Sequence, residues 1–291
     1  LKALAEVKPV IIVMVPLIIE KIVRKSIMPK IQDPKVKMLM KMPVIGQSIK
    51  KKICDGLTQA LGGNFYEVII GGAALNQDVE NLLREIKFPF TIGYGATECA
   101  PIITYSDFKE SRATSCGKAV RNMELKIDSP DPQNVPGEIL TRGLNVMLGY
   151  YKNEETTSTT LDSEGWYHTG DIAYRDRDGY FWFVGRTDDV IKSSGYRIGP
   201  FEVESALMRH PSVLECAITG APDEIRGQVV KATIVLTEEY REKNPKELVK
   251  EIQAYVKEAT APYKYPRIVE FVDELPKTIS GKIKHFEIRN R

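Results

Sequence analysis

Cysteine and histidine are scarce in this chain of 291 residues, which holds four cysteines and three histidines. No two cysteines form a C-x-x-C pair, and no histidine stands at zinc-finger spacing from them. A disulfide-stapled miniature and a zinc-finger module are therefore excluded. We expect buried or free thiols in a reducing compartment, which favours a cytoplasmic location. The cysteines are Cys54, Cys99, Cys116 and Cys216.

Long apolar runs, internal repeats and flexible linkers are also missing. The apolar run at residues 9–19 is too short to span a bilayer and contains Pro9 and Pro16, so we interpret it as a buried strand. With 43% hydrophobic and 27% charged residues, the chain is neither collagen-like nor wholly disordered. Its length suggests one large domain or two ordinary ones.

The net charge of +2 is small and by itself indicates no nucleic-acid or membrane partner. The charge is uneven, however, because residues 21–52 hold ten basic residues and one acidic residue, Asp33. Two interpretations stay open: a solvated helical face interleaved with core methionines, or a surface that faces anionic lipid or nucleotide phosphates. We predict no nucleic-acid partner and, from the second interpretation, a peripheral membrane contact. The basic residues are Lys21, Arg24, Lys25, Lys30, Lys35, Lys37, Lys41, Lys50, Lys51 and Lys52.

Short apolar runs alternate with helical periodicity in the first half of the chain. Residues 7–16, 66–72 and 90–95 are typical of strands, and a helical stripe precedes each of the last two. This βαβ progression predicts an α/β fold with a largely parallel sheet. The stripes consist of Ile49, Ile53, Leu57 and Leu61, and of Val79, Leu82, Leu83 and Ile86.

From residue 116 to 186, Gly, Pro and Asp turns separate short strand patterns, which predicts a β-rich subdomain with a hairpin at Asp178-Gly179. The last hundred residues read as a compact α+β domain. Asn244 and Pro245 are a helix start signal there. The expected strands are 214–219, 229–236 and 268–272, and the expected apolar stripe is Leu248, Ile252, Tyr255, Val256 and Ala259.

Two common nucleotide-binding loops are absent. Gly281-Lys282 is followed by Ile283, so no Walker A loop is present, and the G-x-G that begins at Gly93 continues to Glu98 where a third glycine is required. A Walker NTPase and a Rossmann dehydrogenase are therefore not supported.

The string YGATE follows a predicted strand, at the edge where open α/β sheets bind ligands. Gly95 permits close backbone approach, Tyr94 offers a flat face to a base, Thr97 can donate to a phosphate, and Glu98 can hold Mg²⁺. An ordinary turn explains the string equally well. Residues 71–73 likewise suggest either a slot wall for a flat ligand or a turn that ends a strand.

Three later strings carry charged groups suited to a nucleotide. In YHTGD, the carboxylate of Asp171 can accept both hydroxyls of a ribose, or it simply belongs to a turn. Residues 185–204 contain Arg186 and a Ser-Ser-Gly loop before a helix that starts at Pro200. In PKTISGK, Lys282 follows a glycine turn, and its ammonium could stabilise negative charge that develops on a phosphate during a reaction. The alternative is a lysine that is simply solvated.

Together YGATE, YHTGD, GRTDD, SSGYRIGPFEVE and PKTISGK resemble, in order and spacing, the adenylate-forming superfamily of acyl-CoA synthetases, peptide-synthetase adenylation domains and luciferases. The resemblance covers nearly the whole chain. Residues 1–170 resemble bacterial long-chain fatty-acid CoA ligases, and residues 172–291 look more like medium-chain acyl-CoA synthetases. It implies a fatty acyl-CoA synthetase, which forms an acyl-adenylate from ATP and a fatty acid or other small carboxylic acid and passes the acyl group to CoA.

The resemblance also implies roles for individual residues in the adenylation step, with Lys282 bridging the carboxylate and the α-phosphate. Glu98 would ligate Mg²⁺, and Thr97 would touch the α-phosphate. Asp171 would clamp the ribose of ATP or AMP, assisted by Arg186. The adenine would lie between Gly71, Gly72, Ala73 and Tyr94, with Gly95 beside them.

For the thioester step, the resemblance implies that a small carboxy-terminal domain swings about a hinge at Asp188. The expected domains are residues 1–187, a portion of the large domain with its sheet to about 115 and a β-rich subdomain at 116–187, and residues 188–291. His285 stands where relatives often have arginine. The residues expected near CoA or substrate are Ser194, Gly195, Tyr196, Arg197, Arg226 and Tyr265.

One departure concerns the superfamily's Ser/Thr/Gly-rich phosphate loop, to which nothing in the chain corresponds. We therefore expect a carboxy-terminal fragment that is inactive alone. Two alternatives stay open: a non-catalytic adenylate-binding fragment, and an adenylation domain that loads a carrier protein.

Overall fold

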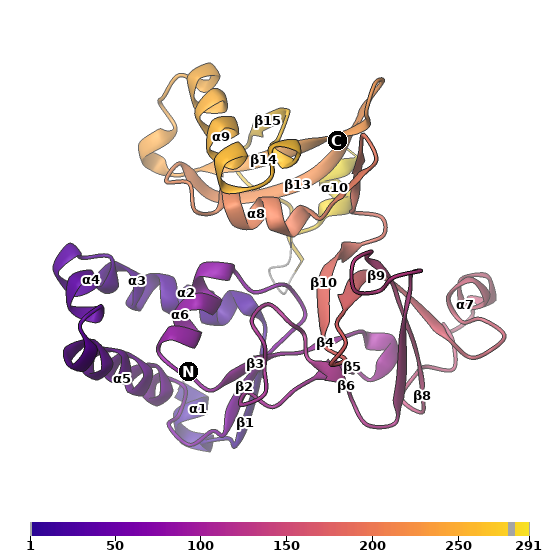
Figure 1. Ribbon diagram of the computed structural model, residues 1–291, viewed down its shortest axis with the longest axis horizontal. Helices are drawn as coiled ribbons and strands as arrows, with labels where there is room; N and C mark the ends of the chain where they lie inside the picture. Colours follow the sequence, from indigo (N-terminus) through magenta and orange to yellow (C-terminus); the bar gives the residue numbers. More distant parts are fainter. Residues whose placement is uncertain (1, 279–282, 291) are drawn as a thin grey trace. The chain divides into compact units, whose positions relative to one another are not determined.

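The computed structural model describes residues 2–278 and 283–290 (Figure 1). Its contacts divide the chain into two compact units. Unit 1 comprises Leu1–Thr169 and Ala173–Phe183, and unit 2 comprises Gly170–Ile172 and Val184–Arg291. We expected a domain boundary between residues 187 and 188, and that boundary stays a prediction.

Unit 1 begins with a three-stranded parallel sheet in the order β1-β2-β3, which confirms the expected βαβ progression. Its strands are β1 (Ile11–Met14), β2 (Glu67–Ile70) and β3 (Phe90–Ile92). The helices are α1 (Lys2–Val7), α2 (Pro16–Ser26), α3 (Met28–Ile31), α4 (Pro34–Met40), α5 (Pro43–Ala60) and α6 (Gln77–Glu85).

Burial of apolar side chains holds these helices on the sheet. Ile19 and Val23 of α2 and Leu57 of α5 are almost completely buried beside Val68 and Ile70 of β2. Leu57 and Leu61 of the first predicted stripe and all four residues of the second belong to this core, with Ile53 packed against it, whereas Ile49 does not belong to it.

We expected a buried strand over residues 7–16, but β1 covers only Ile11–Met14, so this prediction was wrong. Val7 ends α1, and Pro16 occupies the first turn of α2, where its missing N–H costs nothing. In β1, Ile12 and Met14 are buried, whereas Ile11 and Val13 are exposed by 44% and 71%. Only one face of this strand contacts the core.

The expected strand at residues 90–95 is also divided. The N–H of Gly93 donates to the carbonyl of Ile70, and the next residue, Tyr94, pairs with Thr104 in another sheet. That sheet has the order β4-β5-β6. Its strands are β4 (Tyr94–Gly95), β5 (Ile102–Tyr105) and β6 (Lys118–Ala119), with the short 3-10 helix η1 (Thr97–Cys99) after β4.

The β-rich part forms a four-stranded sheet in the order β10-β9-β8-β7, in line with the expected texture of residues 116–186. The loop between β9 and β10 is closed at Asp176, which exchanges hydrogen bonds with Tyr180. The hairpin predicted from Asp178-Gly179 is confirmed. The elements are β7 (Met123–Asp128), β8 (Gly137–Gly143), α7 (Glu154–Thr160), β9 (Tyr167–Arg175) and β10 (Phe181–Arg186).

Unit 2 packs helices on a five-stranded sheet in the order β12-β11-β14-β13, with β15 beside β14. Asn244 caps α9 as expected and accepts a hydrogen bond from the N–H of Lys246. Ala259 lies in the last turn of α9 and is exposed, so its place in the apolar stripe was wrong. The elements are β11 (Ile191–Ser193), β12 (Tyr196–Ile198), α8 (Pro200–Leu207), β13 (Val213–Asp223), β14 (Gly227–Leu236), η2 (Glu238–Tyr240), α9 (Pro245–Ala259), η3 (Pro262–Lys264), β15 (Ile268–Phe271) and α10 (His285–Arg289).

Throughout residues 2–278 and 283–290, no helix combines the length and apolarity that crossing a bilayer requires. The four cysteines are free thiols, three of them buried, as expected.

Candidate functional site

The two glycine-containing strings of unit 1 meet at the carboxyl edge of the parallel sheet. Gly71 follows β2 and Gly93 follows β3, and the N–H of Gly71 donates to the carbonyl of Met14. A Cβ on Gly71 would lie 3.0 Å from the carbonyl oxygen of Gly93. The structure therefore brings residues 71–73 next to the start of YGATE, at the edge where open α/β sheets bind ligands.

Tyr94 and Gly95 form the strand that leads away from this edge. The ring of Tyr94 stacks on Phe183, with 6.1 Å between centroids and 28° between planes. A Cβ on Gly95 would lie 2.1 Å from the carbonyl oxygen of Pro101, a distance that no side chain tolerates. The need for glycine at position 95 comes from this backbone approach within the protein.

Glu98 lies in η1, and its carboxylate accepts a hydrogen bond of 2.8 Å from the hydroxyl of Tyr150. Its carbonyl accepts from the N–H of Met147 at 2.7 Å. Sequence reasoning missed Tyr150, because nothing in its local pattern connects it to a residue 52 positions earlier.

Neighbouring groups around Glu98 are held neutral. Burial, and then the charge of Glu98, raises the pKa of the Cys99 thiol to about 11. Burial is also the main cause that raises the pKa of Tyr167, with Glu98 next. The thiol of Cys99 and the hydroxyl of Tyr167 are therefore protonated, and neither adds a negative charge beside Glu98.

A magnesium ion fits this donor set only in company with a substrate. Among the residues that the structure describes, no three His, Cys, Asp or Glu side chains gather as a metal site. Mg²⁺ is commonly held by one or two carboxylates together with substrate phosphates and water. The single carboxylate of Glu98, the residue next to the exposed Thr97, suits that kind of site.

In unit 2, Asp171 and Arg186 form an ion pair. Nη1 of Arg186 donates to Oδ1 of Asp171 at 3.2 Å; the Asp171 side chain is 10% exposed and that of Arg186 is 51% exposed. Gly170 has φ +68°, and a Cβ there would lie 3.0 Å from the Arg186 guanidinium. Glycine at 170 thus leaves room for the arginine, and the two residues expected at a ribose do lie together.

The expected glycine loop is a tight hairpin turn between β11 and β12. Ser194 and Gly195 both have positive φ, +50° and +82°, which is the geometry of a type I′ turn. The N–H of Ser194 donates to the carbonyl of Arg226 at 3.0 Å, so Arg226 lies beside this turn. The guanidinium of Arg226 stands 4.0 Å from Asp223.

The aromatic partner of the turn is Tyr263, which sequence reasoning did not single out. Its ring stacks on Tyr196 with 4.1 Å between centroids and 15° between planes, and both rings are exposed. Tyr265 instead packs on the core of unit 2 with cations over its ring at 4.1 Å, from Lys257, and 4.9 Å, from Arg267. The expected CoA contact of Tyr265 stays a prediction.

Lys282 lies outside the described residues, but the residues on either side of its segment are described. Lys277 pairs with Ile283 in an antiparallel bridge, and its ammonium binds Glu215 at 2.6 Å. His285 donates to Glu204 at 2.7 Å. Burial lowers the pKa of His285, but the hydrogen bond to Glu204 and the charges of Glu204 and Asp189 together outweigh burial, so the pKa is raised.

Asp188, the expected hinge, lies two residues after the end of β10. The guanidinium of Arg289 in α10 contacts the carbonyl of Asp188, and it lies 3.4 Å from Asp189. A hinge motion there stays a prediction.

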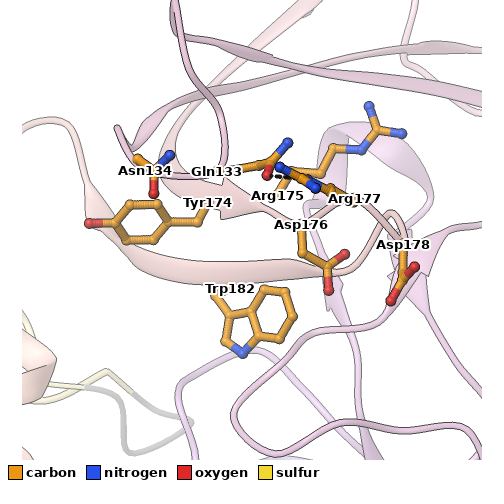
Figure 2. A pocket seen from close by; sticks show the side chains of 8 residues that line it. All are labelled: Gln133, Asn134, Tyr174, Arg175, Asp176, Arg177, Asp178 and Trp182. Carbon is orange, nitrogen blue, oxygen red and sulfur yellow. Dashed lines mark hydrogen bonds between the residues drawn. The ribbon is translucent and has the colours of Figure 1, made fainter.

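An open depression lies on the loop between β9 and β10 in unit 1 (Figure 2). Arg177 donates to Gln133 at 3.0 Å across its rim. None of the residues expected to bind a nucleotide lines it, so this depression is not the candidate site. Its lining residues are Gln133, Asn134, Tyr174, Arg175, Asp176, Arg177, Asp178 and Trp182.

Comparison with known proteins supplies independent information. The family model of the AMP-binding enzyme matches residues 1–151, and that of the AMP-binding enzyme C-terminal domain matches residues 202–282. The chain is 46% identical over 233 residues to the mitochondrial acyl-coenzyme A synthetase ACSM4 of Homo sapiens and 44% identical over 233 residues to ACSM3 of Mus musculus. Each match covers 77% of this chain and 40% of the relative, so the chain spans about 40% of the length of these relatives.

Solved structures agree with this result. The anthranilate CoA ligase AuaEII in complex with anthranoyl-AMP matches 99% of this chain and 50% of its own, with 29% identity and a TM-score of 0.74. The o-succinylbenzoate CoA synthetase MenE from Bacillus subtilis, in complex with its acyl-adenylate intermediate, matches 100% of this chain and 52% of its own, with 26% identity and a TM-score of 0.75. From its family models, relatives and fold, the chain belongs to the AMP-binding enzymes of the adenylate-forming superfamily.

Proposed function

We propose that this chain is part of a fatty acyl-CoA synthetase, which joins a fatty acid to CoA through an acyl-adenylate and releases AMP and pyrophosphate. The relatives carry the name acyl-coenzyme A synthetase, which supports a CoA ligase. The observation that carries the proposal is the meeting of residues 71–73 with YGATE at the carboxyl edge of the sheet, within the part matched by the AMP-binding model.

The adenylation step would use the residues that the sequence predicted for it. We propose that Tyr94 presents a flat face to adenine beside residues 71–73 and that Asp171, oriented by Arg186, accepts the ribose hydroxyls. Thr97 would donate to the α-phosphate. Glu98 would hold Mg²⁺, which neutralises phosphate charge when bound.

Lys282 would supply the remaining positive charge. Its ammonium would stabilise negative charge that grows on the carboxylate and α-phosphate oxygens as pyrophosphate leaves. The antiparallel bridge between Lys277 and Ile283 brings the two ends of its segment together on unit 2.

The thioester step would use the turn of Ser194 and Gly195, with Tyr196, Arg197 and Arg226. A hinge at Asp188 would exchange this turn for the segment of Lys282 at the same nucleotide. The type I′ geometry of this turn needs positive φ at both central residues, and Ser194 and Gly195 both have it. We propose that it lines the path of the CoA thiol, with Tyr265 nearby.

The experiment that tests the function separates the two steps. In the full-length enzyme, Lys282→Ala should slow ATP–pyrophosphate exchange with a fatty acid by about 10² to 10³, as for the loss of one preorganised donor. Thioester formation from preformed acyl-AMP and CoA should remain close to the parent rate. Equal loss in both steps would contradict the role of Lys282.

Two alternatives have their own outcomes. ATP binding by calorimetry without pyrophosphate release from the full-length protein would indicate a non-catalytic adenylate-binding module. Transfer of the acyl group to a carrier protein in preference to CoA would indicate a carrier-loading adenylation domain. We also propose a cytoplasmic location and a peripheral membrane contact through residues 21–52.

A further inference from the structure

Five large apolar side chains are exposed where α4 ends and α5 begins. We call them the apolar corner, and the two most exposed are Met38, at 72%, and Val44, at 81%. Five exposed apolar side chains within eight residues of sequence mark an interaction site more often than a single exposed residue does. The members of the apolar corner are Met38, Leu39, Met42, Val44 and Ile45.

The apolar corner lies outside the core cluster of unit 1, but a close contact between α4 and α5 fixes its shape. No residue from 32 to 52 belongs to the core cluster, whereas α5 joins that cluster further along, at Leu57. Gly46 lets the two helices approach closely, since a Cβ there would lie 2.3 Å from the carbonyl oxygen of Met40. Figure 1 shows α4 and the start of α5 at an end of unit 1 away from β1, β2 and β3.

Three lysines stand at positions next to the apolar corner in the sequence. Lys35, Lys37 and Lys41 are exposed. The acidic residue of the segment, Asp33, is engaged as the N-cap of α4, where its carboxylate accepts from the N–H of Lys35 at 2.8 Å. Of the ten basic residues in 21–52, only Lys50 makes an ion pair with another described residue.

We propose that the apolar corner enters the headgroup region of a bilayer that contains anionic lipid, with Lys35, Lys37 and Lys41 on the lipid phosphates. This inference gives the proposed membrane contact its residues and its lipid chemistry. Exposed apolar side chains with exposed lysines at neighbouring positions suit a bilayer surface, because lysine stems pack along apolar surface while their ammonium groups reach the headgroups. The face would hold the synthetase where its water-insoluble substrate dissolves.

Vesicle sedimentation of the 291-residue chain tests the proposal without catalysis. We expect binding to vesicles of phosphatidylcholine with phosphatidylserine, and much weaker binding to phosphatidylcholine alone. The double variant Lys37→Gln/Lys41→Gln should bind about 25-fold more weakly. The double variant Met38→Gln/Val44→Gln should lose about tenfold, because its apolar contact with lipid is gone.

Matched controls lie outside the segment. Leu148, also fully exposed, can be changed to Gln, and the exposed pair Lys246 and Lys250 can both be changed to Gln. These variants should bind like the parent chain. Circular dichroism confirms that every variant keeps its fold.

Several outcomes overturn the inference: no binding to anionic vesicles, equal binding to neutral vesicles, or equal losses in the control variants. Self-association that disappears in Met38→Gln/Val44→Gln would replace the bilayer by a second copy of the chain. Vesicle binding and pyrophosphate exchange by the full-length enzyme are independent measurements. Failure of vesicle binding leaves the synthetase proposal intact, and failure of pyrophosphate exchange leaves the membrane proposal intact.

Discussion

The hydroxyl of Tyr150 donates a hydrogen bond of 2.8 Å to the carboxylate of Glu98. Tyr150 lies between β8 and α7, so this contact joins that connection to η1 and directs one carboxylate oxygen of Glu98. If Glu98 holds Mg²⁺, Tyr150 is a positioning residue for it.

Tyr150→Phe should weaken use of magnesium by the full-length enzyme. Loss of one hydrogen bond to a charged group is worth about 1.5 to 3 kcal/mol, so we expect an increase of about tenfold or more in the Mg²⁺ concentration at half-maximal pyrophosphate exchange. Tyr151→Phe is the matched control, since Tyr151 is 88% exposed. Unchanged magnesium dependence in Tyr150→Phe would remove Tyr150 from the site.

Asp171→Asn should lower nucleotide affinity. The amide keeps the shape but loses the charge that pairs with Arg186 and one acceptor for the ribose hydroxyls. We expect AMP to bind about 10-fold to 100-fold more weakly by calorimetry on the full-length enzyme. Asp55→Asn, at an exposed position of α5, should bind AMP like the parent; equal affinity in both variants would contradict the ribose role.

Tyr263→Leu should affect the thioester step selectively. An aromatic pair contributes about 0.5 to 1.5 kcal/mol, so losing the stack on Tyr196 should slow acyl transfer from preformed acyl-AMP to CoA by about threefold to tenfold. Tyr263→Phe keeps the ring and should retain the rate. A loss of pyrophosphate exchange as large as the loss of acyl transfer would show that the stack serves the whole fold.

Stability should depend on pH through His285 and Glu204. The folded pKa of His285 is raised, so its contribution is fully present below the unfolded pKa of about 6.5 and is lost as pH rises through the folded value. Asp189 also favours the charged imidazole. Thermal unfolding between pH 5 and pH 9 should show a larger advantage of the parent over Glu204→Gln at the acid end.

The pKa of a second histidine, His210, is shifted in the opposite direction. The parent must therefore be compared with the Glu204→Gln variant at each pH. Burial lowers the pKa of His210 in unit 2, so its contribution is lost as pH falls. Both chains contain His210, and the difference between the parent and Glu204→Gln cancels it. A difference that is constant with pH would show that the pair is not ionised.

Local patterns predicted much of the fold. Helix α9 begins where Asn244 and Pro245 predicted, and α8 begins at Pro200. These signals work because a cap or a fixed φ acts within a few residues. The order and spacing of the five strings, quoted from the chain alone, predicted the superfamily to which it belongs.

Other features depended on where the chain packs. One of the two interpretations of the basic segment placed its methionines in a core, yet Met38 and Met42 are exposed while Met40 is buried, because the main contacts of α4 are with α3 and α5. The change of sheet after Gly93 was not predicted either, since it depends on the partner strand and not on the residues of the strand itself.

The sequence alone determined many of the elements, the parallel order of the first strands and the family, because helix caps, apolar periodicity and motif spacing depend on neighbouring residues. Tertiary structure alone decided which distant groups meet: Tyr150 with Glu98, Tyr263 with Tyr196, and Gly71 with Gly93. The physical reason is that such contacts arise when burial of apolar surface brings separate segments together, and no local preference of either partner encodes the other.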